Sequence, residues 1–261
     1  MKVTLADLVR FKREGKKIAA VVAYDYESIR IVDRAGADII SVGDSAGLAV
    51  FGHELERETT VREMLLLARA ASKAVKNAFL ICDMPYGSYE VSPEDAARHA
   101  VRFWKQGRVD GVKVQVSPDQ AALVEAMART GVPVFCQFGA TPTAAAHIGG
   151  LDEARSEMSI EWLVEAAKTL EAAGASALDL SRGGDATGPV TRAVGIPVLG
   201  GSGNDGECDG QIMQLKRFAG FTVDALDGGS PVYANIAKTM TEAVLAYCVD
   251  VREGKLPLGR R

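Results

Sequence analysis

The sequence alternates repeatedly between a short apolar run and a longer segment with helical periodicity. The apolar runs are rich in β-branched residues and nearly continuous in hydrophobicity, which is typical of parallel strands covered by helices. They predict strands at Ile18–Tyr24, Asp38–Asp44, Phe79–Pro85, Gly111–Val116, Pro133–Phe138, Ser176–Ser181 and Ile196–Gly200. The segments between them predict helices at Tyr26–Ala35, Thr60–Lys76, Pro93–Gln106, Pro118–Thr130, Ile160–Ala173 and Asp209–Ala219.

The number of strand–helix units favours a closed barrel. We predict an eighth strand within Phe221–Ala234, followed by a C-terminal helix at Ile236–Arg252. Seven or eight such units in 261 residues fit an α/β fold of the (β/α)8 TIM-barrel class, which typically takes about 250 residues. An open, doubly wound sheet would usually carry a glycine-rich first turn, whereas the turn after Tyr24 reads Asp-Tyr-Glu-Ser. We therefore predict one barrel domain over residues 1–261, with Gly200–Gly206 as a loop inside it.

Charge and composition exclude several function classes. The net charge is −4 and no Lys/Arg stripe is present, which argues against a nucleic-acid partner. No apolar run approaches the length of a membrane span, and charges recur through Met1–Glu14 where a signal peptide would need an apolar stretch. The four cysteines show no CxxC spacing, which favours reduced thiols. We expect a cytoplasmic protein without a membrane partner.

Polar residues recur at the carboxyl ends of the predicted strands, which is where barrel enzymes place their chemistry. They are Asp44, Asp83, Lys113, Gln115, Gln137, Asp179 and Ser181. Residues two apart on a strand face the same side, so Lys113 and Gln115 share one face, as do Asp179 and Ser181. Charged residues inside an apolar strand are costly unless they are paired or bind a metal.

Two of these acids predict a metal site. Asp44 and Asp83 on neighbouring strands could hold one Mg²⁺ through oxygen, with water and substrate completing the coordination. Magnesium suits the site better than zinc, because no His or Cys cluster accompanies the acids. Any one strand-end Asp could instead cap a helix, and the presence of Lys113 beside both acids favours the functional interpretation.

At these residues the chain resembles the ketopantoate hydroxymethyltransferase (3-methyl-2-oxobutanoate hydroxymethyltransferase) family of the phosphoenolpyruvate mutase/isocitrate lyase superfamily. The likeness covers most of the chain in order, and several short motifs in the correct order are more specific than any one of them. The matching stretches are Ala23-Tyr24-Asp25-Tyr26, Val42-Gly43-Asp44-Ser45, Cys82-Asp83-Met84-Pro85-Tyr86, Val112-Lys113, Thr141-Pro142, Gly149-Gly150, Ile196-Pro197-Val198 and Asp209-Gly210-Gln211.

The resemblance implies a (β/α)8 enzyme that uses Mg²⁺ to bind a 2-oxo acid and acidify its C3 proton. The resulting enolate would attack a one-carbon unit from 5,10-methylenetetrahydrofolate. Asp44 and Asp83 match the family's metal-site aspartates, Ser45 matches a serine that contacts substrate, and Lys113 matches a lysine that binds the substrate's anionic end. Asp83 and Gln137 join Ser45 and Lys113 as expected substrate contacts. The family also implies a homo-oligomer.

Three positions depart from the family pattern, and each replaces a titratable group with a neutral one. Gln115 stands where the family has an acid near the metal, Gln137 where it has a histidine, and Ser181 where it has its base glutamate. A serine cannot act as a general base at neutral pH without a partner that takes its proton. Asp179 is the expected substitute on the same strand face, Asp185 is a second candidate, and Asp179 could instead be the ion-pair partner of Lys113.

We therefore expect Lys113, Ser181 and Asp179 at the catalytic centre, with Asp44, Asp83 and Gln115 at the metal. The leading interpretation is a hydroxymethyltransferase that forms ketopantoate. The alternative is a relative that uses the enolate for another reaction, as an aldol or retro-aldol lyase or an isomerase. A catalytically silent barrel is disfavoured, because Asp44, Ser45, Asp83 and Lys113 are all present.

Overall fold

The computed structural model describes residues 2–142, 149–156, 158–201, 206–229 and 233–255. Their contacts divide the chain into two compact units, Met1–Ile212 and Met213–Arg261. Each unit is described by itself below. The prediction of one domain over residues 1–261 stays a prediction.

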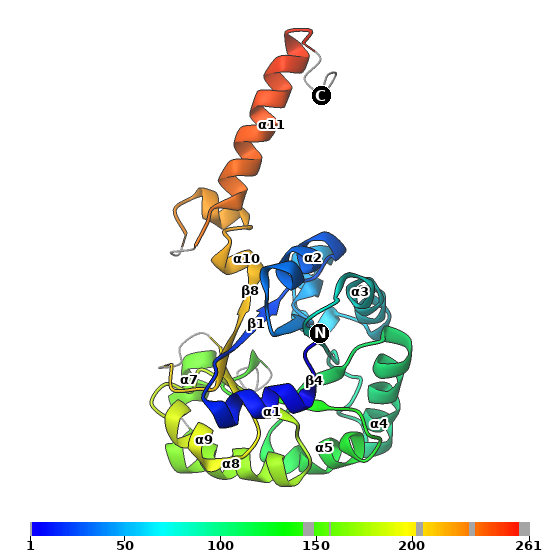
Figure 1. Cartoon of the computed structure of the whole chain (residues 1–261), viewed down its shortest axis with the longest axis vertical. Coiled ribbons are helices and arrows are strands. Elements are labelled where there is room, and N and C mark those ends of the chain that lie inside the picture. The colour runs from blue at the N-terminus through cyan, green and yellow to red at the C-terminus, as the bar shows by residue number, and fades with distance from the viewer. Residues whose placement is uncertain (1, 143–148, 157, 202–205, 230–232, 256–261) are drawn as a thin grey trace. The chain divides into compact units, whose positions relative to one another are not determined.

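Parallel strands β1 to β8 form a closed barrel in sequence order, which confirms the predicted (β/α)8 fold. Helices lie around the outside of these strands (Figure 1). The strands are β1 (Ile18–Val22), β2 (Ile39–Val42), β3 (Phe79–Asp83), β4 (Gly111–Gln115), β5 (Val134–Gly139), β6 (Ala177–Ser181), β7 (Val198–Gly200) and β8 (Gly210–Gln214). The central strands are buried along most of their length, as expected for a sheet covered on its outer face.

The helices begin and end where local sequence signals place them. Ser92 accepts a hydrogen bond from the Asp95 N–H at 3.1 Å and precedes Pro93, the first residue of α4. Gly36 ends α2 at a φ of 96°, a left-handed conformation that glycine adopts without strain. The α-helices are α1 (Leu5–Glu14), α2 (Tyr26–Ala35), α3 (Val61–Ala74), α4 (Pro93–Arg102), α5 (Ala121–Ala128), α7 (Leu151–Ser156), α8 (Ile160–Ala172), α9 (Thr187–Ala193), α10 (Leu215–Phe218) and α11 (Ile236–Arg252). Short 3-10 or π segments are η1 (Gly47–Phe51), η2 (Glu56–Glu58), η3 (Phe103–Gly107), η4 (Pro118–Gln120) and η5 (Val223–Leu226).

The predicted helix over Asp209–Ala219 is wrong in its first half. Residues 210–214 form the closing strand β8, and only Leu215–Phe218 are helical. The cause lies outside the segment: the Ile18 amide donates to the Asp209 carbonyl at 2.9 Å, and β8 runs beside β7 from Gly210 onward. Barrel closure thus overrides the local helical pattern.

The eighth strand predicted within Phe221–Ala234 is wrong in the residues described there, which contain the 3-10 helix η5. Residues 230–232 lie outside the described part of the chain, as do residues 202–205 of the loop predicted at Gly200–Gly206.

The barrel interior has an apolar layer and a polar layer. Phe79 and Phe135 face inward near the amino ends of β3 and β5, and their ring centroids are 5.8 Å apart. Four residues further along β3, on the same face, Asp83 marks the polar layer at the carboxyl ends of the strands. The apolar layer closes one end of the barrel and leaves the polar layer as its chemically active end.

The second unit, Met213–Arg261, contains α10, η5 and α11. Asn235 caps α11 by accepting a hydrogen bond from the Lys238 N–H at 2.9 Å. In this unit α11 has no buried residue, although it carries many apolar side chains. No described helix combines the length and apolar character that crossing a membrane requires.

We expect Gly210→Ala to destabilise the barrel. A Cβ at this position would lie 2.1 Å from the Ile18 carbonyl oxygen, so the β1 and β8 backbones would have to separate. Overpacking of this kind costs about 1–3 kcal/mol in the free energy of unfolding, measurable by urea denaturation. Gly201→Ala is the control, because a Cβ there meets no atom of the described residues within 4 Å. Equal stabilities of the two variants would contradict the close approach.

Candidate active site

The strand register places the five inward-facing residues of the polar layer in two neighbouring rows. Asp83 is the register partner of Lys113 across β3 and β4. Gln115 pairs with Gln137, and Gln137 pairs with Asp179, across β4, β5 and β6. All five lie at or near the carboxyl ends of their strands, on the inner face of the barrel.

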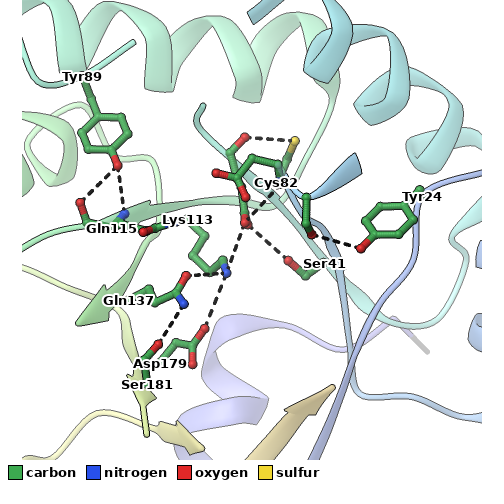
Figure 2. Close-up of polar contacts among 12 residues, drawn as sticks. Tyr24, Ser41, Cys82, Tyr89, Lys113, Gln115, Gln137, Asp179 and Ser181 are labelled. Carbon is green, nitrogen blue, oxygen red and sulfur yellow. Dashed lines mark hydrogen bonds and ion pairs between the residues drawn. The ribbon is translucent and has the colours of Figure 1, made fainter. Parts of the chain in front are cut away.

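Lys113 is the centre of this layer. Its Nζ lies 3.2 Å from Asp83 Oδ2 and 3.5 Å from Asp179 Oδ2, and it donates to Gln137 Oε1 at 3.0 Å (Figure 2). The exposed fractions of these charged side chains are 8% or less. Burial alone would lower the pKa of Lys113, but the negative charges of Asp83 and Asp179 raise it above its ordinary value. Lys113 is therefore a fixed cation in a nearly dry environment.

Asp44 and Asp83 converge at the ends of β2 and β3. The Asp44 N–H donates to Asp83 Oδ2 at 3.4 Å, and Ser41 donates to Asp83 Oδ1 at the same distance. Burial raises the pKa of Asp44 to about 8, and the charge of Asp83 contributes to that shift. Burial also raises the pKa of Asp83, although Lys113 opposes the shift. Both carboxyl groups are thus costly to ionise, chiefly because they are buried.

The acid cluster is short of positive charge. One ammonium, Lys113, faces three carboxyls, Asp44, Asp83 and Asp179, so full ionisation would leave the buried cluster negative. No group of three or more His, Cys, Asp or Glu side chains suited to a metal occurs in the described part of the chain. Two carboxylates are nevertheless enough for Mg²⁺, which keeps several water ligands and completes its shell with substrate. The residues fit an open magnesium site and do not fit a closed structural one.

Ser45 lies beside the acid pair. A Cβ added at Gly43 would lie 3.0 Å from both Ser45 Oγ and Val22 Cγ1 and 3.7 Å from Asp83 Oδ2, so a side chain at position 43 would crowd these groups. Ser45 is buried, and its Oγ is hydrogen-bonded to the Tyr24 hydroxyl at 3.0 Å (Figure 2). Tyr24 and Ser41 were not among the residues predicted for the site. The one signal for Ser41 is its position as the single polar residue in the buried strand Ile39–Val42.

The sixth strand holds the residues expected at the base position. Asp179 is 4% exposed and lies within ion-pair distance of Lys113, as the alternative interpretation expected. Burial raises its pKa, and the charge of Lys113 opposes that rise. Ser181 Oγ accepts a hydrogen bond from Gln137 Nε2 at 2.9 Å. The catalytic roles predicted for Asp179 and Ser181 stay predictions.

Gln115 lies at the end of β4 on the same face as Lys113. The hydroxyl of the buried Tyr89 donates to the Gln115 carbonyl and accepts from the Gln115 N–H, each at 3.1 Å (Figure 2). These two bonds hold the strand end in place. The metal-binding role predicted for its side chain stays a prediction.

A cavity of about 170 Å³ adjoins the carboxyl end of β6. Ser181 lines it together with Asp185, an exposed acid of the loop before α9. Arg182, which also lines it, has a φ of 52°, a left-handed conformation that is uncommon for residues other than glycine. The remaining lining residues are Ala140, Met158, Ile160, Leu163, Gly183 and Ala186. The cavity therefore has one polar side at the strand end and one apolar side.

A model of the ketopantoate hydroxymethyltransferase family matches residues 2–258. The chain belongs to this family, and it is an enzyme. It is 35% identical to a 3-methyl-2-oxobutanoate hydroxymethyltransferase of Clostridium botulinum (strain Alaska E43 / Type E3) over 98% of this chain and 94% of that protein. It is 36% identical to the enzyme of that name from Chlorobaculum tepidum (strain ATCC 49652 / DSM 12025 / NBRC 103806 / TLS), with the same coverage.

Solved structures similar to this member of the ketopantoate hydroxymethyltransferase family share its fold. A 2,3-dimethylmalate lyase of the PEP mutase/isocitrate lyase superfamily has a TM-score of 0.62 at 17% identity and covers 100% of this chain and 90% of its own. A phosphonopyruvate hydrolase in complex with oxalate and Mg²⁺ has a TM-score of 0.63 at 14% identity and covers 98% and 89%. At these identities the likeness concerns the barrel alone.

We expect Asp44→Asn to stabilise the metal-free protein at high pH. Because the folded-state pKa of Asp44 is about 8, well above the ordinary 3.8, the folded state keeps a proton that the unfolded chain has lost. Stability therefore falls as pH rises from about 4 to about 8, and the whole penalty is present above pH 8. In EDTA-treated protein, the variant should melt roughly 4 °C or more above wild type at pH 9, and close to wild type at pH 4.

Asp119→Asn, an exposed acid after β4, is the matched control and should show no such pH dependence. A gain from Asp44→Asn that is equal at both pH values would contradict the raised pKa.

Proposed function

We propose that this enzyme transfers a hydroxymethyl group from 5,10-methylenetetrahydrofolate to 3-methyl-2-oxobutanoate in a magnesium-dependent reaction. The observation that carries the proposal is the acid pair Asp44 and Asp83 beside the buried Lys113, at the carboxyl end of a barrel in this family. The relatives are named 3-methyl-2-oxobutanoate hydroxymethyltransferases, which gives that acid as their substrate.

Asp44 and Asp83 would hold the magnesium ion. Their raised pKa values support this assignment, because a divalent cation would offset the charge that the cluster lacks. Magnesium, when bound, supplies Lewis-acid chemistry that acidifies the proton next to the keto group of a 2-oxo acid. A complex with oxalate and Mg²⁺ in a protein of the same fold supports the choice of ligands by analogy only.

Lys113 and Ser45 would orient the substrate. With magnesium bound, the fixed positive charge of Lys113 would help attract the anionic 2-oxo acid to the strand ends. The Ser45 hydroxyl, positioned by Tyr24, lies beside the acid pair and can hydrogen-bond a substrate oxygen. The two groups together fix the end of the substrate that does not react.

Asp185 is our candidate for the general base. Asp179 is ion-paired with Lys113, and among the described residues Ser181 has no basic partner. Asp185, by contrast, lines the cavity next to Ser181. Asp185 would take the proton from C3 of the 2-oxo acid. C3 would then form a bond to the methylene carbon as one carbon–nitrogen bond of the folate breaks. Water would form the carbon–oxygen bond as the second carbon–nitrogen bond breaks, and the two folate nitrogens would take up the proton from C3 and one from water, which leaves tetrahydrofolate.

We expect Asp185→Asn to abolish C3 proton exchange. Wild-type protein with Mg²⁺ and 3-methyl-2-oxobutanoate in D2O should lose the C3–H signal in NMR, since the base exchanges the proton it removes. The variant should slow this exchange by about 100-fold or more, the usual effect of losing a general base. Asp119→Asn, also an exposed acid, should exchange at the wild-type rate.

The same experiment separates the candidate reactions. Adding 5,10-methylenetetrahydrofolate to the wild type should yield ketopantoate. Exchange without a folate-dependent product would favour the lyase or isomerase alternative, because both also need the enolate. If Asp185→Asn exchanges the C3 proton at the wild-type rate, Asp185 is not the base.

We also propose that the protein forms a homo-oligomer through the Met213–Arg261 unit. A groove of about 440 Å³ separates η5 from one face of α11 and is lined mainly by apolar side chains, among them Phe221, Val223, Leu226, Met240, Val244 and Leu245. Val244 and Leu245 are 58% and 59% exposed in one chain, which favours a second copy of this chain as the cover. Cytoplasmic localisation stays a prediction from the sequence.

We expect Val244→Glu to shift the protein to a smaller assembly in light scattering coupled to size-exclusion chromatography, because it places a charge in the apolar groove. Ala243→Glu introduces the same side chain next to the groove and should keep the wild-type mass. An unchanged mass for Val244→Glu would contradict an interface at this groove.

A further inference from the structure

Lys113, Gln137 and Ser181 form a chain of hydrogen bonds along the inner face of β4, β5 and β6. Lys113 Nζ donates to Gln137 Oε1 at 3.0 Å, and Gln137 Nε2 donates to Ser181 Oγ at 2.9 Å (Figure 2). The chain begins at the buried ion-pair cluster and ends at the cavity beside β6. It therefore links the charged centre of the site to a surface that a ligand can reach.

The direction of every bond in this chain is fixed by Lys113. An ammonium group can only donate, so the amide oxygen of Gln137 must face Lys113 and the amide nitrogen must face Ser181. Ser181 Oγ then accepts a hydrogen bond, and its own hydrogen has to point elsewhere. Ser181 also lines the cavity, so a hydrogen that points away from Gln137 can serve a ligand there.

We infer that Gln137 is a positioning residue that keeps Ser181 as a hydrogen-bond donor to an oxygen of a small 2-oxo acid whose branched end occupies this cavity. The inference rests on the proposed function for the class of ligand. It adds a role for two residues that stand where the family pattern has titratable groups.

The size and lining of the cavity support such a ligand. A cavity of about 150 Å³ can hold benzene, so about 170 Å³ accommodates a small branched acid and not a whole folate. Met158, Ile160 and Leu163 provide an apolar side for the branched carbon end. Ser181 would bind an oxygen at the polar side, where a hydrogen bond to a charged acceptor is stronger than one to a neutral acceptor.

The same geometry argues against Ser181 as a nucleophile or base. An activated serine donates its hydrogen to a basic group, whereas here the neighbouring Gln137 nitrogen donates to the serine oxygen. Donation from Gln137 makes the hydroxyl hydrogen more positive, because hydrogen bonds in a chain polarise one another. The Ser181 hydroxyl is thus suited to donate a hydrogen bond to a ligand oxygen.

A double-mutant cycle on ligand binding tests the inference. Gln137→Glu keeps an acceptor oxygen for Lys113, but it also places an acceptor oxygen where the wild type has the amide nitrogen that faces Ser181. The Ser181 hydroxyl must then donate to Glu at 137 and can no longer donate to a ligand in the cavity. Gln137→Met removes the amide without adding a charge. We would measure the dissociation constants of 3-methyl-2-oxobutanoate, pyruvate and 2-oxobutanoate by calorimetry in the presence of Mg²⁺, for each variant with Ser181 and with Ser181→Ala.

We expect Ser181→Ala and Gln137→Glu each to weaken binding of 3-methyl-2-oxobutanoate about tenfold or more. With Ala at 181, Gln137→Glu should add less than about threefold, and Gln137→Met should weaken binding less than it does with Ser at 181. The charge introduced at 137 is present in both backgrounds, so the cycle isolates the part that acts through Ser181.

Two results would overturn the inference: wild-type binding by Ser181→Ala, or an equal loss from Gln137→Glu in both backgrounds. Failure of the proposed function is a separate result. If the wild type forms ketopantoate but the effects of the substitutions at 137 and 181 on the dissociation constant are independent, this inference alone is overturned. If the two substitutions are coupled in 2-oxo acid binding but the wild type shows neither C3 proton exchange nor a folate-dependent product, the proposed reaction alone is overturned. A wild type that binds none of the three acids overturns both.

Discussion

The buried ammonium of Lys113 is the interaction on which the rest of the site depends. It neutralises part of the charge of Asp83 and Asp179, and neither acid could be buried in its ionised form without such a partner. The barrel makes the arrangement possible, because strands β3, β4 and β6 point these side chains inward from different directions. An isolated pair on a surface would be screened by water and would impose little order on its neighbours. Here the pairing fixes the positions of three strand ends.

Sequence periodicity predicted the barrel because most strands carry their own signal. Gly111–Gln115 and Ala177–Ser181 are apolar runs whose polar residues mark the strand ends, so local pattern and final fold agree. Gly210–Gln214 carries no such signal. Its strand conformation depends on the β1 and β7 backbones beside it, which lie far away in the sequence, and so its helical pattern misled the prediction.

The candidate site could be predicted as a set of residues but not as a network. Asp44, Asp83, Lys113, Gln137, Asp179 and Ser181 were all identified from strand ends, and the structure brings them together. Two hydrogen bonds could not be predicted from the sequence. One is donated by Gln137 to Ser181, and the other joins Tyr24 and Ser45. Each depends on side-chain rotamers across two elements, which periodicity does not encode.

The direction of the hydrogen bonds gives a physical reason for an amide at position 137. A histidine there can change protonation state, so its two nitrogens can donate or accept as the proton requires. An amide has one acceptor end and one donor end, and beside an ammonium only one orientation satisfies both neighbours. With glutamine in place of histidine, position 137 can no longer transfer a proton, but the direction of its two hydrogen bonds is fixed. With Ser181 where the family resemblance implies an acid, this end of the sixth strand offers a donor, and the proposed proton removal would come from another element. The loop that carries Asp185 is the described element that lines the same cavity with a carboxyl group.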